Sequence, residues 1–234
     1  MSALNSLHQQ NVVIVGGTSG LGRAIAQAAK NAGAIVTVLG RSASTHEGIT
    51  GISADITDAS SLGQAFASIG PIQHLVLTSG ARVGSPKLPA LSEEELQLAF
   101  SVKVFGYVKA VQVALPYLAA DASVTLTSGI LARKPGPGGL LKSMVNASVE
   151  AMGKNLAKEL APRRVNVVSP GVIDTELWGA PGSDARNAVM EKVAPGLPVG
   201  RVGQPGEVAQ VYLMAMQNGF INGTVLDVEG GGLL

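Results

Sequence analysis

The sequence predicts an α/β fold in which helices cover both faces of a parallel β-sheet. Apolar runs of strand length, rich in valine and isoleucine, alternate along the chain with segments of helical periodicity. Of the 234 residues, 46% are hydrophobic and only 14% are charged, which is typical of strands buried on both faces. No repeat, linker or run of charge divides the chain, so we expect one domain over residues 1–234.

Each element of this fold has its own signal in the sequence. Strands are expected where short apolar runs end in glycine or proline, at 11–17, 34–40, 74–80, 122–129, 164–171 and 224–230. Helices are expected where apolar residues recur at helical spacing, at 21–33, 60–70, 92–119, within 136–161 and at 205–217. Gly33 is a common type of helix C-cap, and Ser92 followed by acidic residues is a common helix start. Such alternation predicts right-handed βαβ units.

Composition excludes several classes of function. A net charge of +1 and 3% aromatic residues give no basis for nucleic-acid or acidic-membrane binding. The absence of cysteine excludes disulfides and thiolate zinc sites, and the three widely separated histidines predict no metal site. Residues 1–10 do not resemble a signal peptide, and no run of about 18 apolar residues predicts a membrane span. We therefore expect a soluble cytoplasmic protein.

A glycine-rich loop follows the first strand. Gly16, Gly20 and Gly22 have GxxxGxG spacing, come after a strand and open a helix. Glycines in this context permit a tight turn and a close approach of the backbone to a pyrophosphate, with the helix N-terminus directed at the anion. The alternative is a glycine turn that serves only to pack the strand against the helix.

The end of the second strand indicates which dinucleotide would bind. An acidic residue here commonly binds the ribose 2′-hydroxyl of NAD, whereas this chain has Gly40 and Arg41. An arginine can instead pair with the 2′-phosphate of NADP, and Arg23 is a second candidate for that role. Asp55, after a short third strand, can accept a hydrogen bond from the adenine amino group. The alternative for Arg41 is a solvated surface charge.

Residues 176–204 form an irregular stretch with two Ala-Pro-Gly triplets and the only tryptophan, Trp178. Such a segment near the end of a strand can act as a lid over a substrate pocket. The alternative is an ordinary surface insertion. We predict a substrate lid over 176–204.

The motifs together resemble the short-chain dehydrogenase/reductase family over nearly the whole chain. The resemblance rests on five stretches in the family's order: GGTSGLG (16–22), ADITD (54–58), LAKELAPRRVNVVSPGVIDT (156–175), GRVGQPGEVAQVYLMA (200–215) and INGTVLDVEGG (221–231). It implies a Rossmann-type doubly wound parallel sheet of seven strands with helices on both faces. It also implies a nicotinamide cofactor and self-association as a dimer or tetramer.

The resemblance also assigns a cofactor site by position. The cofactor-binding residues that it implies are Gly16, Thr18, Ser19, Gly20, Leu21, Gly22, Arg23, Arg41, Ser42, Asp55, Ile56, Thr78, Ser79, Gly80, Pro170, Gly171, Ile173 and Thr175. The family's Asn-Asn-Ala-Gly after the fourth strand appears here as Leu77-Thr78-Ser79-Gly80, so Gly80 is kept and the asparagine contacts are lost. Arg41 makes NADP(H) the expected cofactor.

The proton-transfer residues of the family depart from its pattern. Ser128 matches the family's serine, with the alternative that it is a strand-end serine bonding its own backbone. Counting from Pro116 places Lys103 where the family has asparagine, and Lys142 and Asn146 stand where it has tyrosine and lysine. No Tyr-x-x-x-Lys occurs anywhere in the chain. The asparagine and lysine positions have therefore exchanged residue types, and a lysine replaces the tyrosine.

This exchange leaves two main functional interpretations. In the first, the chain is an NADP(H)-dependent oxidoreductase that transfers hydride to or from a small apolar carbonyl, alcohol or imine. Its general acid is Lys142, oriented with Ser128, Asn146 and Lys103, and a nearby Lys103 charge together with burial lowers the Lys142 pKa. In the second, it is an NADP(H)-binding protein without hydride chemistry. An imine-forming lysine and a purely structural oligomer remain further alternatives.

Overall fold

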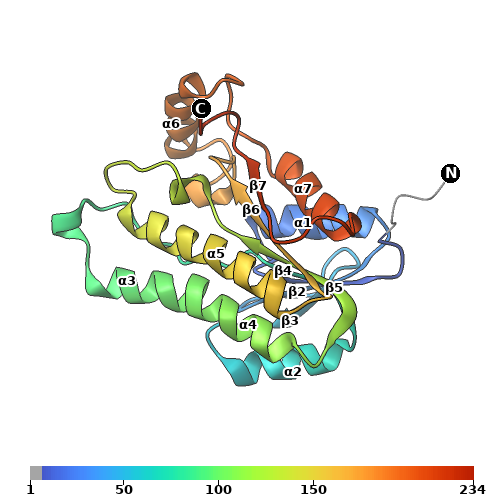
Figure 1. Ribbon diagram of the computed structural model, residues 1–234. Coiled ribbons are helices and arrows are strands. Elements are labelled where there is room, and N and C mark those ends of the chain that lie inside the picture. Colours follow the sequence, from blue (N-terminus) through green and yellow to red (C-terminus); the bar gives the residue numbers. More distant parts are fainter. Residues whose placement is uncertain (1–6) are drawn as a thin grey trace.

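Seven parallel strands form one sheet in the order β3-β2-β1-β4-β5-β6-β7 in the computed structural model (Figure 1), which confirms the predicted Rossmann-type fold. The strands are β1 Asn11–Val15, β2 Ile35–Gly40, β3 Thr50–Ser53, β4 Ile72–Leu77, β5 Leu118–Thr127, β6 Arg164–Pro170 and β7 Val225–Val228. The structure describes residues 7–234. Residues 1–6, part of the segment in which no signal peptide is expected, lie outside the described residues.

Helices cover both faces of the sheet. The helices are α1 Gly20–Asn31, α2 Ala59–Ile69, α3 Glu93–Ala99, α4 Gly106–Ala114, α5 Leu140–Glu159, α6 Asp184–Val193 and α7 Pro205–Gln217. On one face, α2, α4 and α5 contribute Phe66, Tyr107 and Val149 to a common core. On the other, α1 and α7 pack together and contribute Ile25 and Tyr212 to a second core (Figure 1). The central strands are therefore buried on both sides.

The chain reverses its order along the sheet between β1 and β4, the two central strands that run side by side. In a parallel sheet all carboxyl ends lie at one edge, and the crevice at such a switch point is the usual ligand site of this fold class. The loops after β1, β4, β5 and β6 therefore meet at this edge. These loops carry most of the residues that the sequence assigns to the cofactor.

The single helix expected over 92–119 is wrong in two respects. The structure divides it into α3, a π-helical turn at Phe100–Phe105 and α4, which ends at Ala114. Pro116 lacks a backbone N–H and so cannot continue the helical hydrogen bonding. The chain then enters β5 at Leu118, which is paired with Ile72 of β4. The π-helical turn matters for the site because it contains Lys103.

Candidate functional site

The glycine loop between β1 and α1 is built for close backbone approach. Gly16 and Gly20 have φ angles of 94° and 52°, in the left-handed region that favours glycine. A Cβ on Gly22 would lie 2.2 Å from the Gly16 carbonyl oxygen, and one on Gly16 would lie 2.7 Å from the Ser79 amide nitrogen. The loop therefore requires glycine for steric reasons, and α1 begins within it with its N-terminus at the carboxyl edge.

A carboxylate already lies at this helix N-terminus. Glu176 Oε2 accepts a hydrogen bond from the Gly20 amide at 3.2 Å, and Glu176 Oε1 forms an ion pair with Arg23. Its own backbone N–H and the Arg23 charge lower the pKa of the Glu176 carboxyl, against the opposing effect of burial. The loop and Arg23 thus accept an anionic oxygen, which is the chemistry that a dinucleotide pyrophosphate would require.

The loop after β4 supports the glycine loop. Thr78 Oγ1 lies 3.1 Å from the carbonyl oxygen of Gly16 and donates to it, and the Ser79 carbonyl accepts from the Tyr107 hydroxyl at 2.9 Å. A Cβ on Gly80 would meet no atom within 4 Å, so open space remains beside the chain there. Thr78 and Ser79 therefore hold the loops in place, while Gly80 is exposed beside them.

The adenine end of the predicted cofactor site lies beside β2 and β3. Arg41 and Ser42 are exposed after β2, and the Ser53 hydroxyl holds the Arg41 carbonyl at 2.9 Å. Asp55 Oδ1 accepts from the backbone N–H and the hydroxyl of Thr57, both at 2.8 Å. These bonds lower the pKa of the Asp55 carboxyl, so it is an ionised acceptor at neutral pH. Ile56 is buried beside it.

The segment after β6 closes the same edge. Gly171 is packed so tightly that a Cβ would lie 2.8 Å from the Glu229 Cα, and Ile173 is buried. Thr175 is also buried, and its Oγ1 accepts from the Leu177 amide at 3.4 Å to cap a short 3-10 turn at Glu176–Trp178. The turn and α6 together make up most of the predicted lid.

Lys103 and Asn146 meet across the gap between two helices. Lys103 Nζ donates to Asn146 Oδ1 at 2.7 Å and to the Ser128 carbonyl at 3.0 Å. Asn146 is buried, and Lys103 is partly buried. Both acceptors are neutral, and burial lowers the pKa of the Lys103 ammonium to about 8. The exchange of residue types read from the sequence thus corresponds to a direct contact between two side chains.

The hydroxyl of Ser128 is directed at α5. Its Oγ donates to the Asn146 carbonyl at 3.1 Å and to Glu150 Oε1 at 3.2 Å, and the residue is 3% exposed. The single hydroxyl proton is shared between these two acceptors, so the Ser128 hydroxyl already donates its hydrogen bond within the protein. This geometry differs from the alternative in which Ser128 bonds only to its own backbone, because both acceptors lie on α5 and one of them is a carboxylate.

Lys142 lies apart from the other three residues. Its Nζ donates to Ser85 Oγ, in the loop after β4, at 2.7 Å. Burial lowers the pKa of Lys142, and the expected contribution from the Lys103 charge is not among the causes. The structure therefore brings Lys103, Asn146 and Ser128 into contact. Lys142 lies one turn before Asn146 on α5 and contacts Ser85 instead.

Two residues at this site escaped the sequence interpretation. Glu150 accepts from Ser128 and pairs with Arg133 at 3.3 Å. The signal was available, because Lys142, Asn146 and Glu150 recur every four residues and share one helix face. Gly129 is the other, since a Cβ there would lie 2.8 Å from Asn146 Nδ2. Glycine at 129 leaves room for the Asn146 amide to reach Lys103.

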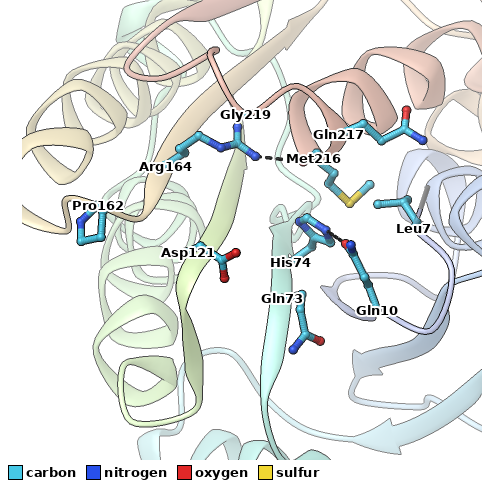
Figure 2. A pocket seen from close by; sticks show the side chains of 10 residues that line it. All are labelled: Leu7, Gln10, Gln73, His74, Asp121, Pro162, Arg164, Met216, Gln217 and Gly219. Carbon is cyan, nitrogen blue, oxygen red and sulfur yellow. Dashed lines mark hydrogen bonds between the residues drawn. The ribbon is translucent and has the colours of Figure 1, made fainter. Parts of the chain in front are cut away.

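A separate cavity of about 270 Å³ lies at the opposite edge of the sheet (Figure 2). Arg164 and His74, two of its polar residues, bond to other groups of the protein. Arg164 donates to the Ala215 and Met216 carbonyls at the end of α7, and His74 contacts Ser123 Oγ at 2.7 Å and Gln10 Oε1 at 2.5 Å. Burial lowers the pKa of His74 to about 4, so the ring is neutral at pH 7. These groups stabilise the fold, and the catalytic candidates lie elsewhere.

Two further expectations concern the whole described chain. Among residues 7–234 no group of three or more His, Asp or Glu side chains could hold a metal ion. Within the same range, every helix is too short or too polar to cross a membrane.

The doubly wound sheet and the glycine loop at its switch point define a class of α/β proteins that bind a dinucleotide at the carboxyl edge. A family model described as enoyl-(acyl carrier protein) reductase matches residues 15–232. The chain belongs to the short-chain dehydrogenase/reductase family, a family of oxidoreductases.

Several relatives span the same length as this chain. The short-chain dehydrogenase/reductase ucsE of Acremonium sp is 31% identical over 98% of this chain and 97% of its own. A small-chain dehydrogenase solved in complex with NADPH is 36% identical, with a TM-score of 0.83 over 96% of this chain and 99% of its own. The MalC reductase/Diels-Alderase of Malbranchea aurantiaca is 28% identical, with a TM-score of 0.89 over 98% of both chains.

Proposed function

We propose that this chain is an NADP(H)-dependent oxidoreductase that acts on a small apolar carbonyl, alcohol or imine. The observation that carries the proposal is the contact of Lys103 Nζ with Asn146 Oδ1 at 2.7 Å. An ammonium and an amide remain paired at the positions where the family has its asparagine and lysine. Random loss of the site would not be expected to preserve such a complementary pair.

The choice of NADP(H) rests on three observations. The glycine loop accepts an anionic oxygen, Arg41 is exposed after β2 where a 2′-phosphate would lie, and a similar dehydrogenase was solved with NADPH. The residues proposed to hold the pyrophosphate are Gly16, Thr18, Ser19, Gly20, Leu21 and Gly22. Arg23, which the sequence offered as a partner of the 2′-phosphate, pairs with Glu176 beside the glycine loop, so we assign it to the pyrophosphate instead. Pro170, Gly171, Ile173 and Thr175 would border the nicotinamide. When bound, this cofactor would supply or accept the hydride.

The chain's own residues would handle the proton. In the reducing direction Lys142 Nζ donates a proton to the substrate oxygen or nitrogen as negative charge develops there. Lys142 is half-buried and its ammonium lies on the flexible end of the side chain, so it can turn from Ser85 towards the substrate. Lys103 has a pKa of about 8 and can exchange protons near neutral pH, while Asn146 fixes its position.

Substitution of Lys142 tests this role. Lys142→Met should lower kcat by at least about 100-fold, the usual contribution of a general acid, and Lys142→Arg should recover little because arginine does not release its proton near neutral pH. The affinity for NADPH, measured by fluorescence titration, should stay unchanged in both variants. Lys154→Met removes an exposed lysine of the same helix and serves as the control. Full turnover by Lys142→Met would contradict the proposal.

A second function is favoured by two specific contacts. Ser128 Oγ donates to Glu150 of α5, and Lys142 Nζ donates to Ser85. Polar groups that are already bonded within the protein are expected of a chain that binds NADP(H) for sensing or assembly without hydride chemistry. Titration with NADPH followed by oxidation assays over a panel of carbonyls and imines separates the two. Tight binding with no oxidation on any compound supports the second function, and turnover on one compound supports the first.

Self-association as a dimer or tetramer is part of the proposal. Leu98 of α3, Phe105 of the π-helical turn and Val108 of α4 are exposed apolar residues along the unbroken helical stretch 93–114. Exposed apolar groups in a contiguous stretch mark interaction surfaces. Light scattering coupled to gel filtration measures the mass of the oligomer directly. Phe105→Asp should reduce that mass if the helical stretch 93–114 forms the interface. A cytoplasmic location stays a prediction.

A further inference from the structure

Glu176, the first residue of the predicted lid, occupies the position that an anionic ligand of the glycine loop would take. Its Oε2 lies 3.2 Å from the Gly20 amide at the N-terminus of α1, and its other oxygen is paired with Arg23. The pyrophosphate of a dinucleotide seeks the same two partners, a helix N-terminus and a cation. Two anions cannot use both partners at once without strong repulsion.

The backbone around Glu176 is held independently of this contact. Trp178 Nε1 donates to the Ile173 carbonyl at 2.9 Å, and Asp174 Oδ1 pairs with Arg186 Nε of α6 at 2.5 Å. Thr175 caps the 3-10 turn. These bonds remain if the carboxylate leaves Gly20, so the Glu176 side chain can rotate away without unfolding the turn.

We propose that Glu176 is a built-in competitor of the cofactor, which must displace its carboxylate from Gly20 and Arg23 to bind. The proposal rests on the proposed NADP(H) binding and adds the residue that sets its affinity. This competition lowers the affinity for the cofactor below that of a glycine loop with no carboxylate bound to Gly20 and Arg23. It also links the first turn of the lid to the occupancy of the pyrophosphate site.

The size of the effect follows from the exposure of the pair. The side chains of Arg23 and Glu176 are 63% and 31% exposed, so solvent screens their attraction. A screened ion pair and one charge-assisted hydrogen bond must be broken, and removal of that cost should tighten binding about tenfold. Glu176→Gln is the appropriate variant because glutamine keeps the shape of the side chain and loses its charge.

The test compares dissociation constants measured by NADPH fluorescence and by calorimetry. Glu176→Gln should tighten NADPH binding about tenfold, whereas Glu191→Gln, which removes an exposed carboxylate from α6, should leave it unchanged. Adenosine 2′-monophosphate has no pyrophosphate and should bind wild type and Glu176→Gln equally. In an Arg23→Met background the gain from Glu176→Gln should shrink, because the two residues act as a pair.

The outcomes separate this proposal from the proposed function. Unchanged or weaker NADPH binding by Glu176→Gln overturns the competitor role and leaves NADP(H) binding intact. Equal tightening of adenosine 2′-monophosphate also overturns it, because the effect would then not arise at the pyrophosphate. If neither wild type nor the variant binds NADPH, the proposed function fails and the competitor role fails with it.

Discussion

Lys103 provides a quantitative test of the site through the pH dependence of stability. Its ammonium donates to two neutral acceptors, and among the described residues no carboxylate lies within ion-pair distance of it. Burial moves its pKa from 10.5 to about 8 in the folded chain. The folded state therefore disfavours the charged lysine, and the perturbation to test is Lys103→Met.

The sign follows from proton linkage. Between pH 8 and 10.5 the unfolded chain keeps the lysine proton while the folded chain releases it, so the free energy of unfolding rises with pH in this window. Stability is lost as pH falls from about 10.5 to about 8 and is then constant. A shift of this size corresponds to about 3 kcal/mol, of which about 2 kcal/mol should be recovered between pH 7 and 10.

Urea denaturation of wild type and Lys103→Met at pH 7, 8, 9 and 10 measures this difference. Lys103→Met also loses the hydrogen bonds to Asn146 and Ser128. In wild type the Lys103 amine can donate these bonds in its charged and in its neutral form, so we expect their loss to lower stability by a similar amount at each pH. The stability of wild type relative to Lys103→Met should therefore rise by about 2 kcal/mol from pH 7 to 10. Lys154→Met controls for the loss of one charge and should run parallel to wild type. Parallel profiles for Lys103→Met and wild type would refute a buried ammonium at this position.

Two other substitutions test neighbouring parts of the site. Gly129→Ala places a methyl group 2.8 Å from Asn146 Nδ2, so it should displace the amide from Lys103 and cost about 1–3 kcal/mol of stability by urea denaturation. The pH dependence from Lys103 should persist in this variant, because burial, and not Asn146, lowers the Lys103 pKa. Arg41→Ser should weaken NADPH binding by at least about tenfold in fluorescence titrations and leave NADH binding nearly unchanged, because only NADPH carries the 2′-phosphate; equal loss for both cofactors would place Arg41 away from that phosphate.

The fold was predictable because its signals are local. Runs such as Val12–Val15 are apolar at every position, and this pattern is typical of strands buried on both faces, as the structure shows. The glycine loop could also be read, since the spacing of Gly16, Gly20 and Gly22 reflects steric demands that only glycine meets. Counting along two helices assigned Lys103 and Asn146 to positions that face each other in the family that the chain resembles, and the structure shows the contact between them.

The details that escaped prediction depend on contacts between distant segments. No local signal marks the π-helical turn at Phe100–Phe105, which alters the register between Lys103 and the rest of its helix. The direction of the Ser128 hydroxyl depends on Glu150, a residue on another element. Glu176 was assigned to a lid on composition, and its contact with Gly20 joins residues 156 positions apart. Rotamers of this kind are set by tertiary packing, which the sequence pattern does not encode.

The exchange of lysine and asparagine has a consequence for the direction of the proposed chemistry. In the family's arrangement the residue four positions after the proton donor is a lysine, whose charge lies on the same helix face. Here that residue is Asn146, and the ammonium reaches it from Lys103 on a different helix. Lys142 thus has a neutral amide as its helical neighbour, and burial is what lowers its pKa. A lysine without an adjacent cation keeps its proton more readily near neutral pH, which suits a donor in reduction better than a base in oxidation.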